Sequence, residues 1–301
     1  MAVYKKSYRG YDGPLTPAWS RVFIIPRYAF EEMHRSRFLN LFFLASMLNP
    51  LVCAFLIYVN QNLNFLKLLP EAPKGGFLTI GSTFFLMFLG IQSMAGFFMT
   101  AFVGPGLVSP DLANNALPLY LARPFSRKEY VLGKMLVLLM LLSIMTWIPG
   151  LLLFALHGAL AGNGWMGANL RIAAGLFFGA WIWILVLSLL ALALSAWVKW
   201  KPAAGVLLFV VFFVLSGFGT AVNGVLRTHW GRLLDISHLV GSVWVWLFEK
   251  PVERGAGAVF FRVDSGEQIP IWCCWVALAG VCAVCLALLA KKIRGAEVVR
   301  S

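Results

Sequence analysis

Few residues of this chain have the types and spacing that catalysis or metal binding requires. Cys282 and Cys285 have the CxxC spacing of a redox or metal pair, but they lie in an apolar stretch without a second pair of ligands. Small, polarisable core residues are the better interpretation of these cysteines. No tight ligand spacing such as HExxH joins the histidines, which are His34, His157, His229 and His238. We therefore expect no catalytic and no metal-binding residues.

Chemistry that would power transport is also missing from the sequence. Gly133-Lys134 is followed by Met135 and lacks the upstream glycine of a phosphate-binding loop, so the chain itself is not expected to hydrolyse ATP. The acidic residues lie outside the apolar stretches or at their edges, so ion-coupled transport lacks its usual titratable group. Backbone carbonyls alone can still bind sodium, which leaves that mode open. We expect a protein that is not an enzyme and holds no cofactor of its own.

Uncharged polar residues do occur inside two apolar stretches. Asn49, followed by Pro50, lies in the first, and the pair Gln92 and Ser93 lies in the second. Hydrogen bonding between helices and local kinking would account for them. The alternative is that Asn49, Gln92 and Ser93 line a substrate path, and we retain them as candidates for a translocation path.

The most ordered charged stretch follows the second apolar stretch. Ser109-Pro110-Asp111 has the hydroxyl, proline and carboxylate of a helix start. Arg123-Pro124 would end that helix, because a residue before proline avoids helical backbone angles. Ser126 and Glu129 then form a capping box that starts the next helix. We predict a short cytoplasmic helix over about 110–122, a stop and a capped restart, all within a segment spanning 104–129.

Long apolar stretches must position these residues. The chain of 301 residues is 60% hydrophobic and 12% charged, whereas a soluble domain is about 25% charged. A helix needs about 20 apolar residues to cross the hydrocarbon layer. We predict an all-α, polytopic membrane protein with six transmembrane helices, at 38–59, 77–103, 130–156, 173–198, 203–222 and 271–290. These spans would form one transmembrane domain over 38–301.

The basic residues predict the orientation and the surroundings. Most Lys and Arg residues fall in 1–37, 123–134, 199–201 and 291–300, which all lie on one side of the six spans. The excess of positive charge predicts that this side, with both termini, is cytoplasmic. We expect no cleavable signal peptide, because residues 1–37 are polar, basic and aromatic. The net charge of +13 then indicates contact with membrane lipid headgroups rather than with nucleic acid.

Two further segments have amphipathic patterns. In the N-terminal segment 1–37, a helix restarting at Pro26 would separate apolar from charged residues; the apolar set is Ala29, Phe30 and Met33, and the charged set is Arg27, Glu31 and Arg35. It fits a helix on the inner membrane surface, or else a solvated flank without a defined role. Within the outer segment 223–270, apolar residues recur at helical spacing over 236–248. We predict an interfacial or re-entrant helix there, before the last span.

The charged stretch resembles a known family. The segment SPDLANNALPLYLARPFSRKEYVLGK is similar to the connection between the second and third spans of the permease subunits of type-2 ABC exporters. The matching positions are Asp111, Leu117, Arg123, Pro124, Phe125, Ser126, Arg127, Glu129, Tyr130, Gly133 and Lys134. The six spans and the two amphipathic helices extend the similarity along the chain.

The resemblance implies a half-transporter. Such permeases pair with a second permease subunit, as a homo- or heterodimer, and a separate ATP-binding cassette ATPase carries ATP and Mg²⁺ beneath each half. The helix after the second span would be the coupling helix. By this resemblance the ATPase-coupling residues would be Asp111, Leu117, Arg123, Pro124, Ser126, Arg127 and Glu129. The protein would lie in a bacterial cytoplasmic membrane. An ATP-independent carrier or channel, and a membrane scaffold subunit, are the alternatives.

Overall fold

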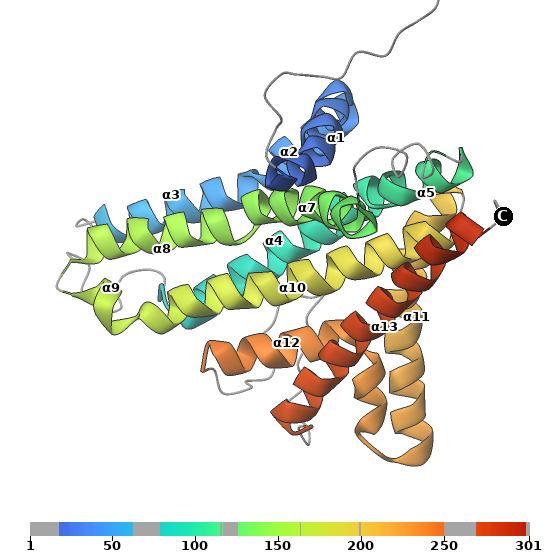
Figure 1. The fold of residues 1–301 in the computed structure, drawn as a ribbon. Coiled ribbons are helices and arrows are strands. Elements are labelled where there is room, and N and C mark those ends of the chain that lie inside the picture. The colour runs from blue at the N-terminus through green and yellow to red at the C-terminus, as the bar shows by residue number, and fades with distance from the viewer. Residues whose placement is uncertain are drawn as a thin grey trace, which may run out of the picture.

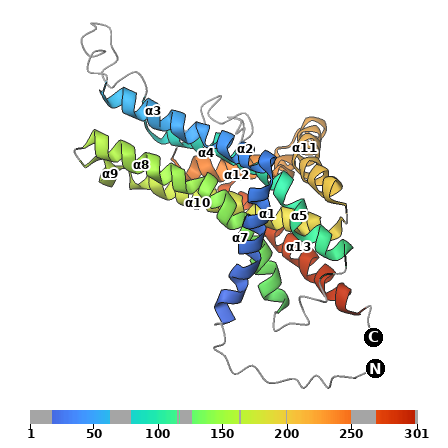
Figure 2. The same ribbon diagram turned by 90° about the horizontal axis from the view of Figure 1, so that it is seen from above.

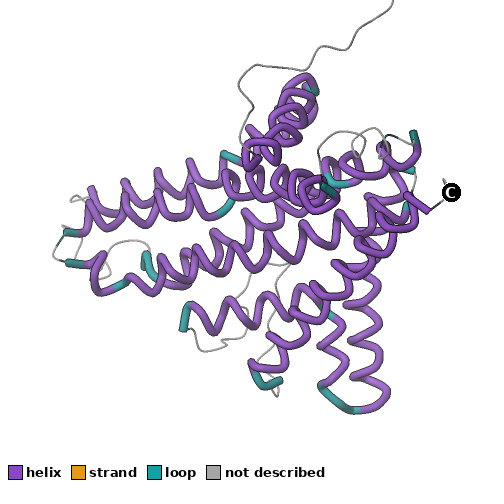
Figure 3. Tube along the Cα trace, in the orientation of Figure 1, coloured by secondary structure: helices purple, strands orange, loops and turns teal. Residues whose placement is uncertain are grey.

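The computed structural model describes residues 18–62, 79–114, 116, 126–162, 164–198, 200–249 and 269–298. Every regular element in these ranges is a helix (Figures 1 and 3). The elements are η1 Ala18–Phe23, α1 Ile24–Arg35, α2 Arg37–Ser46, α3 Leu48–Asn62, α4 Ser82–Val103, α5 Pro105–Ala113, α7 Arg127–Met145, α8 Trp147–Ala161, α9 Trp165–Ala168, α10 Leu170–Trp197, α11 Lys201–Leu226, η3 Trp230–Leu234, α12 Ile236–Leu247 and α13 Ile271–Val298.

Among the described residues, six helical stretches are long and apolar enough to cross a membrane. They are Arg37–Asn62, Ser82–Ala113, Arg127–Ala161, Leu170–Trp197, Lys201–Leu226 and Ile271–Lys292. Each overlaps one predicted span, so the all-α, six-span prediction is confirmed. The bundle has an α5 end and an opposite α9 end, which are separated by the length of α10 (Figure 1).

Three prolines explain where helices restart. Pro26, Pro50 and Pro149 are each the third residue of a helix, in α1, α3 and α8 respectively. Amide groups in the first turn have no acceptor within the helix, so a residue without an N–H is tolerated there. The chain therefore breaks two residues before each proline, which puts the α1 break at Ile24 rather than at the expected Pro26.

The helix after the second span differs from the prediction. α5 begins at Pro105, directly after Gly104, and ends at Ala113. Gly104 keeps helical backbone angles (φ −54°, ψ −46°), so the chain continues from α4 with almost no interruption. Pro110 consequently lies inside α5, and the expected start at Ser109-Pro110-Asp111 is wrong. Of the predicted 110–122 helix, only its first residues lie within α5; residues 117–122 lie outside the described residues.

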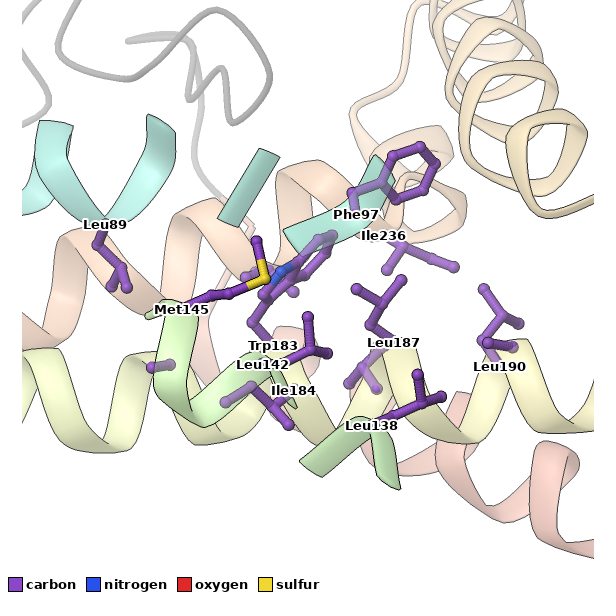
Figure 4. Close-up of a cluster of buried hydrophobic side chains, with 14 of the residues drawn as sticks. Leu89, Phe97, Leu138, Leu142, Met145, Trp183, Ile184, Leu187, Leu190 and Ile236 are labelled. Carbon is purple, nitrogen blue, oxygen red and sulfur yellow. The ribbon is translucent and has the colours of Figure 1, made fainter. Parts of the chain in front are cut away.

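The core is built around α10, which contacts α4, α5, α7, α8, α11, α12 and α13. Trp183 lies near its middle, fully buried, and its indole N–H donates to the backbone oxygen of Ser93 in α4 at 3.2 Å. The ring of Trp183 also packs edge-on against Phe212 of α11 and Trp244 of α12. Figure 4 shows this part of the core, in which labelled side chains of α4, α7 and α12 lie around those of α10.

The N-terminal helix α1 lies across the start of α7 (Figure 2). Ala29, Phe30 and Met33 pack on the core, whereas Arg27, Glu31 and Arg35 are exposed, as the amphipathic pattern predicted. Arg35 forms an ion pair with Glu31 at 3.2 Å. A glycine permits the crossing, because a Cβ at Gly133 would lie only 3.0 Å from the Ile25 Cδ1 atom and 3.2 Å from the Val22 oxygen.

Helix α12 packs inside the bundle rather than on its surface. Its predicted apolar stripe is buried against α10 and α13. Two glycines of α10 make room for it, since a Cβ at Gly175 would meet the Phe248 ring and one at Gly179 would meet Trp244 at 3.1 Å. α12 therefore runs antiparallel to the first half of α10 (Figure 1). The position of α12 relative to the membrane, interfacial or re-entrant, stays a prediction.

Candidate functional site

Asp111 joins α5 to the start of α7. The Lys134 Nζ atom lies 2.7 Å from the Asp111 Oδ2 atom, and the Tyr130 hydroxyl donates to the same oxygen at 2.8 Å. Tyr130 and Lys134 are four residues apart on α7, so both side chains lie on the same face of the helix. The ammonium group also lies 5.6 Å from the centroid of the Tyr130 ring. One carboxylate thus accepts from two groups of the neighbouring span.

The ion pair is largely removed from solvent. The side chains of Lys134 and Asp111 are 11% and 15% exposed, and Tyr130 is buried. An ion pair in such surroundings adds little net stability, but removing one partner leaves the other charge buried without compensation. Separating α5 from α7 would therefore cost free energy, because it would leave both charges without a partner.

Ser195 joins the same helix to α10. Its hydroxyl donates to the Pro105 carbonyl at 3.1 Å and accepts from the amides of Ser109 at 3.0 Å and Val108 at 3.3 Å. In a regular helix the Ser109 amide would bond directly to the Pro105 carbonyl. The hydroxyl of α10 thus ties the backbone of the first turns of α5 to the fourth span. A Cβ at Gly104 would lie 3.0 Å from that of Ala191, so the two helices also pack closely.

The start of α7 is capped as predicted. The Ser126 amide donates to the Glu129 Oε2 atom at 2.5 Å, and the Glu129 amide donates to the Ser126 hydroxyl at 3.2 Å. This reciprocal pair is a complete capping box. Arg127 is the first residue of α7. Leu117, Arg123 and Pro124 lie outside the described residues.

The candidate path residues form a network between the first two spans. The side-chain amide of Asn49 donates to the Gln92 Oε1 atom at 3.1 Å, and the side-chain amide of Gln92 donates to the backbone carbonyl of Ser46 at 3.1 Å. Pro50 explains the second bond, since it lacks the N–H that would otherwise bond to Ser46. Gln92 and Ser93 are fully buried, with no hydrogen-bond partner for the Ser93 hydroxyl among the described residues. Interhelical hydrogen bonding accounts for Asn49 and Gln92, and their place on a path stays a prediction.

Sequence reasoning missed three of the residues that hold α5. Tyr130 and Lys134 lay within the family-like motif but received no role, although a basic residue within a span, four positions after a tyrosine, was a usable signal. No sequence signal marks Ser195, which lies 86 residues from its partner Ser109. Within the described ranges, no group of three His, Cys, Asp or Glu residues is placed to hold a metal ion.

The fold and this junction define a polytopic helical membrane protein whose second span continues into a helix tied to the third and fourth spans. A family model described as "ABC-2 family transporter protein" matches residues 27–232, from α1 through η3. The chain therefore belongs to the ABC-2 transporter family, and at the level of that family it is an ABC permease. The family implies an ABC ATPase as partner in general. No curated protein matches the chain significantly.

Proposed function

We propose that the chain is the membrane-spanning permease subunit of an ABC exporter, coupled to a separate ATPase through α5 and the start of α7. The observation that carries this proposal is the attachment of α5 to two spans, by Asp111 to α7 and by Ser195 to α10. A displacement of α5 then moves both spans together. A rigid helix transmits such a displacement, whereas a flexible loop would not.

Several partners follow from the proposal. ATP and Mg²⁺ bind to the ATPase subunit, and this chain lines the translocation path together with a second permease subunit. The α5 end and both termini face the cytoplasm, because most of the basic residues lie there. The exposed face of α1 forms a second contact with the ATPase. The protein lies in the cytoplasmic membrane.

The first experiment is to purify the permease from its own membranes and to identify the proteins bound to it. We expect an ATPase with a phosphate-binding loop. Solute transport by the permease in ATP-free proteoliposomes would instead indicate a carrier or channel. Partner binding without any flux would indicate a scaffold.

The second experiment tests coupling in the reconstituted complex. Asp111→Ala is expected to lower transport per ATP hydrolysed while the ATPase stays bound. Glu249→Ala is the matched control, since it removes an exposed acidic side chain that pairs with Arg171 at the α9 end. Equal transport per ATP in both variants would refute the role of α5.

A further inference from the structure

A group of lysines and tryptophans lies at the α5 end of α10, α11 and α13. Trp197 ends α10, Lys201 begins α11, and Lys292 lies near the end of α13. The Lys292 Nζ atom lies 5.2 Å from the centroid of the Trp197 ring, and the Trp197 indole N–H donates to the Leu288 oxygen at 3.3 Å. These contacts join the ends of α10 and α13 into one surface.

The indoles of this surface remain open to the surroundings. Trp197 is 45% exposed and Trp200 is 72% exposed. Tryptophan is enriched at the membrane–water interface, where the ring lies among lipid headgroups and the N–H can reach a polar partner. A soluble face would gain nothing from two exposed indoles, so these rings indicate a lipid environment.

The lysines of this surface have no acidic partner among the described residues. Lys201 and Lys291 are exposed, and within the described residues none of Lys201, Lys291 and Lys292 forms an ion pair. α10 and α11 contain no acidic residue. Two other basic residues at the α5 end do have acidic partners, since Lys134 pairs with Asp111 and Arg35 pairs with Glu31.

We infer that this surface binds the headgroup of an anionic phospholipid. The lysines contact the phosphate, while Trp197 and Trp200 lie beside the glycerol region and the upper acyl chains. The cytoplasmic leaflet carries anionic lipid, and basic surfaces between helices on that side bind such headgroups. Lys201 extends the site to α5, because its Nζ atom lies 3.9 Å from where a Cβ of Gly106 would be. The bound headgroup therefore adjoins the first turn of α5.

The test measures lipid preference of the full-length permease by native mass spectrometry, after exchange into mixtures of phosphatidylglycerol and phosphatidylcholine. The variant is the triple change Lys201→Gln, Lys291→Gln and Lys292→Gln. The matched control is Arg27→Gln, Arg37→Gln and Lys128→Gln, which removes the same charge from exposed residues at the same end. A lysine near a headgroup contributes about fivefold to binding.

We expect the triple variant to lose the preference for phosphatidylglycerol by about tenfold or more, and the control to change it by less than about twofold. Trp200→Leu should release both lipids more readily without changing their ratio. Equal losses in variant and control would overturn the proposal in favour of a diffuse charge effect, and unchanged retention in Trp200→Leu would overturn the assignment of a lipid.

Two other outcomes would also overturn it. Displacement of phosphatidylglycerol by millimolar inorganic phosphate would indicate a site for soluble phosphate. An unchanged lipid preference in the triple variant, together with loss of ATPase binding, would assign the lysines to a subunit contact. Because lipid binding is measured without the ATPase, failure of this proposal leaves the proposed transport function untouched.

Discussion

At the scale of single residues, α5 depends on two polar contacts of different kinds. Asp111 contributes a charge that Lys134 and Tyr130 compensate, and Ser195 contributes a hydroxyl that hydrogen-bonds to the backbone of α5. Both contacts are buried, where an unpaired polar group is costly because no water replaces the lost partner. Each therefore gives a sharp prediction for a single substitution.

Lys134→Met should destabilise the fold and uncouple the transporter. The substitution keeps most of the side-chain volume but leaves the Asp111 carboxylate buried with Tyr130 alone. Breaking a buried pair costs about 3–5 kcal/mol, and we expect roughly 2–3 kcal/mol because both side chains are slightly exposed. Chemical unfolding in detergent measures the change.

The control for this pair is Arg35→Met, which removes an exposed partner of Glu31. An exposed pair is worth about 0.2–1 kcal/mol, so the effect should be small. The charge swap Asp111→Lys with Lys134→Asp should recover part of the stability. Equal effects of Lys134→Met and Arg35→Met would contradict the importance of the buried pair.

Ser195→Ala should cost about 0.5–1.5 kcal/mol of unfolding free energy, because it removes the hydroxyl that hydrogen-bonds the backbone of α5 to α10. Ser188→Ala is the matched control on the same helix, since Ser188 is equally buried and its hydroxyl has no hydrogen-bond partner among the described residues. That control should change stability by less than about 0.5 kcal/mol. Thermal unfolding of both variants in the same detergent measures the two changes in stability. Similar changes for Ser195→Ala and Ser188→Ala would refute the role of the Ser195 hydroxyl.

At the scale of elements, glycines decide which helices touch. Gly175 and Gly179, four residues apart on α10, form the surface on which α12 lies, and the Trp244 indole N–H donates to the Gly179 oxygen at 2.8 Å. Small residues at this spacing allow helix backbones to approach closely in membranes. Polar groups complete both ends of α12: Asp235 accepts from the His238 amide, and Arg171 donates to the Leu247 carbonyl. These groups satisfy backbone donors and acceptors that have no partner within the helix at its two ends.

Gly133→Val should detach α1 from α7. The added side chain would overlap Ile25 and the Val22 oxygen, and the backbone oxygen cannot move aside as a flexible side chain can. We expect faster proteolysis within α1 and weaker ATPase binding, with the six spans still folded. Gly280→Val is the control, because nothing lies within 4 Å of a Cβ at that position. Unchanged proteolysis in Gly133→Val would contradict the packing of α1 on α7.

At the scale of the whole molecule, the α5 end collects the parts that we assign to coupling and to lipid binding. α1, α5, the start of α7 and the ends of α10 and α13 all lie there (Figures 1 and 2). An ATPase beneath this end would contact helices that connect directly to the second, third and fourth spans.

Orientation gives a prediction for the whole chain. Reporter proteins that are active only in the cytoplasm should be active when fused at either terminus, because six spans and the charge bias place both on that side. A reporter inserted after Ala161, at the α9 end, should be inactive. Reporter activity after Ala161, together with inactive reporters at both termini, would show that the topology is inverted. The α5 end would then face away from the cytoplasm, which would contradict the proposed contact with the ATPase.

The sequence by itself determined the number of spans, the amphipathic faces of α1 and α12, and the capping box at Ser126. These features depend on residues within a few turns of one another, so local periodicity and capping chemistry suffice to predict them. The start of the coupling helix was misjudged, because Ser-Pro-Asp is a good local start and yet helical geometry at Gly104 lets α4 continue into α5.

Only the tertiary structure decided how α5 is held and where α12 lies. The bond between Ser195 and Ser109 joins residues 86 positions apart, and the contact between Asp111 and Lys134 depends on how α5 packs against α7. Such contacts arise from the packing of whole helices, in which small residues set how closely the backbones approach. The sequence shows which of these residues can donate, accept or carry a charge, but it does not show which of them pair with one another.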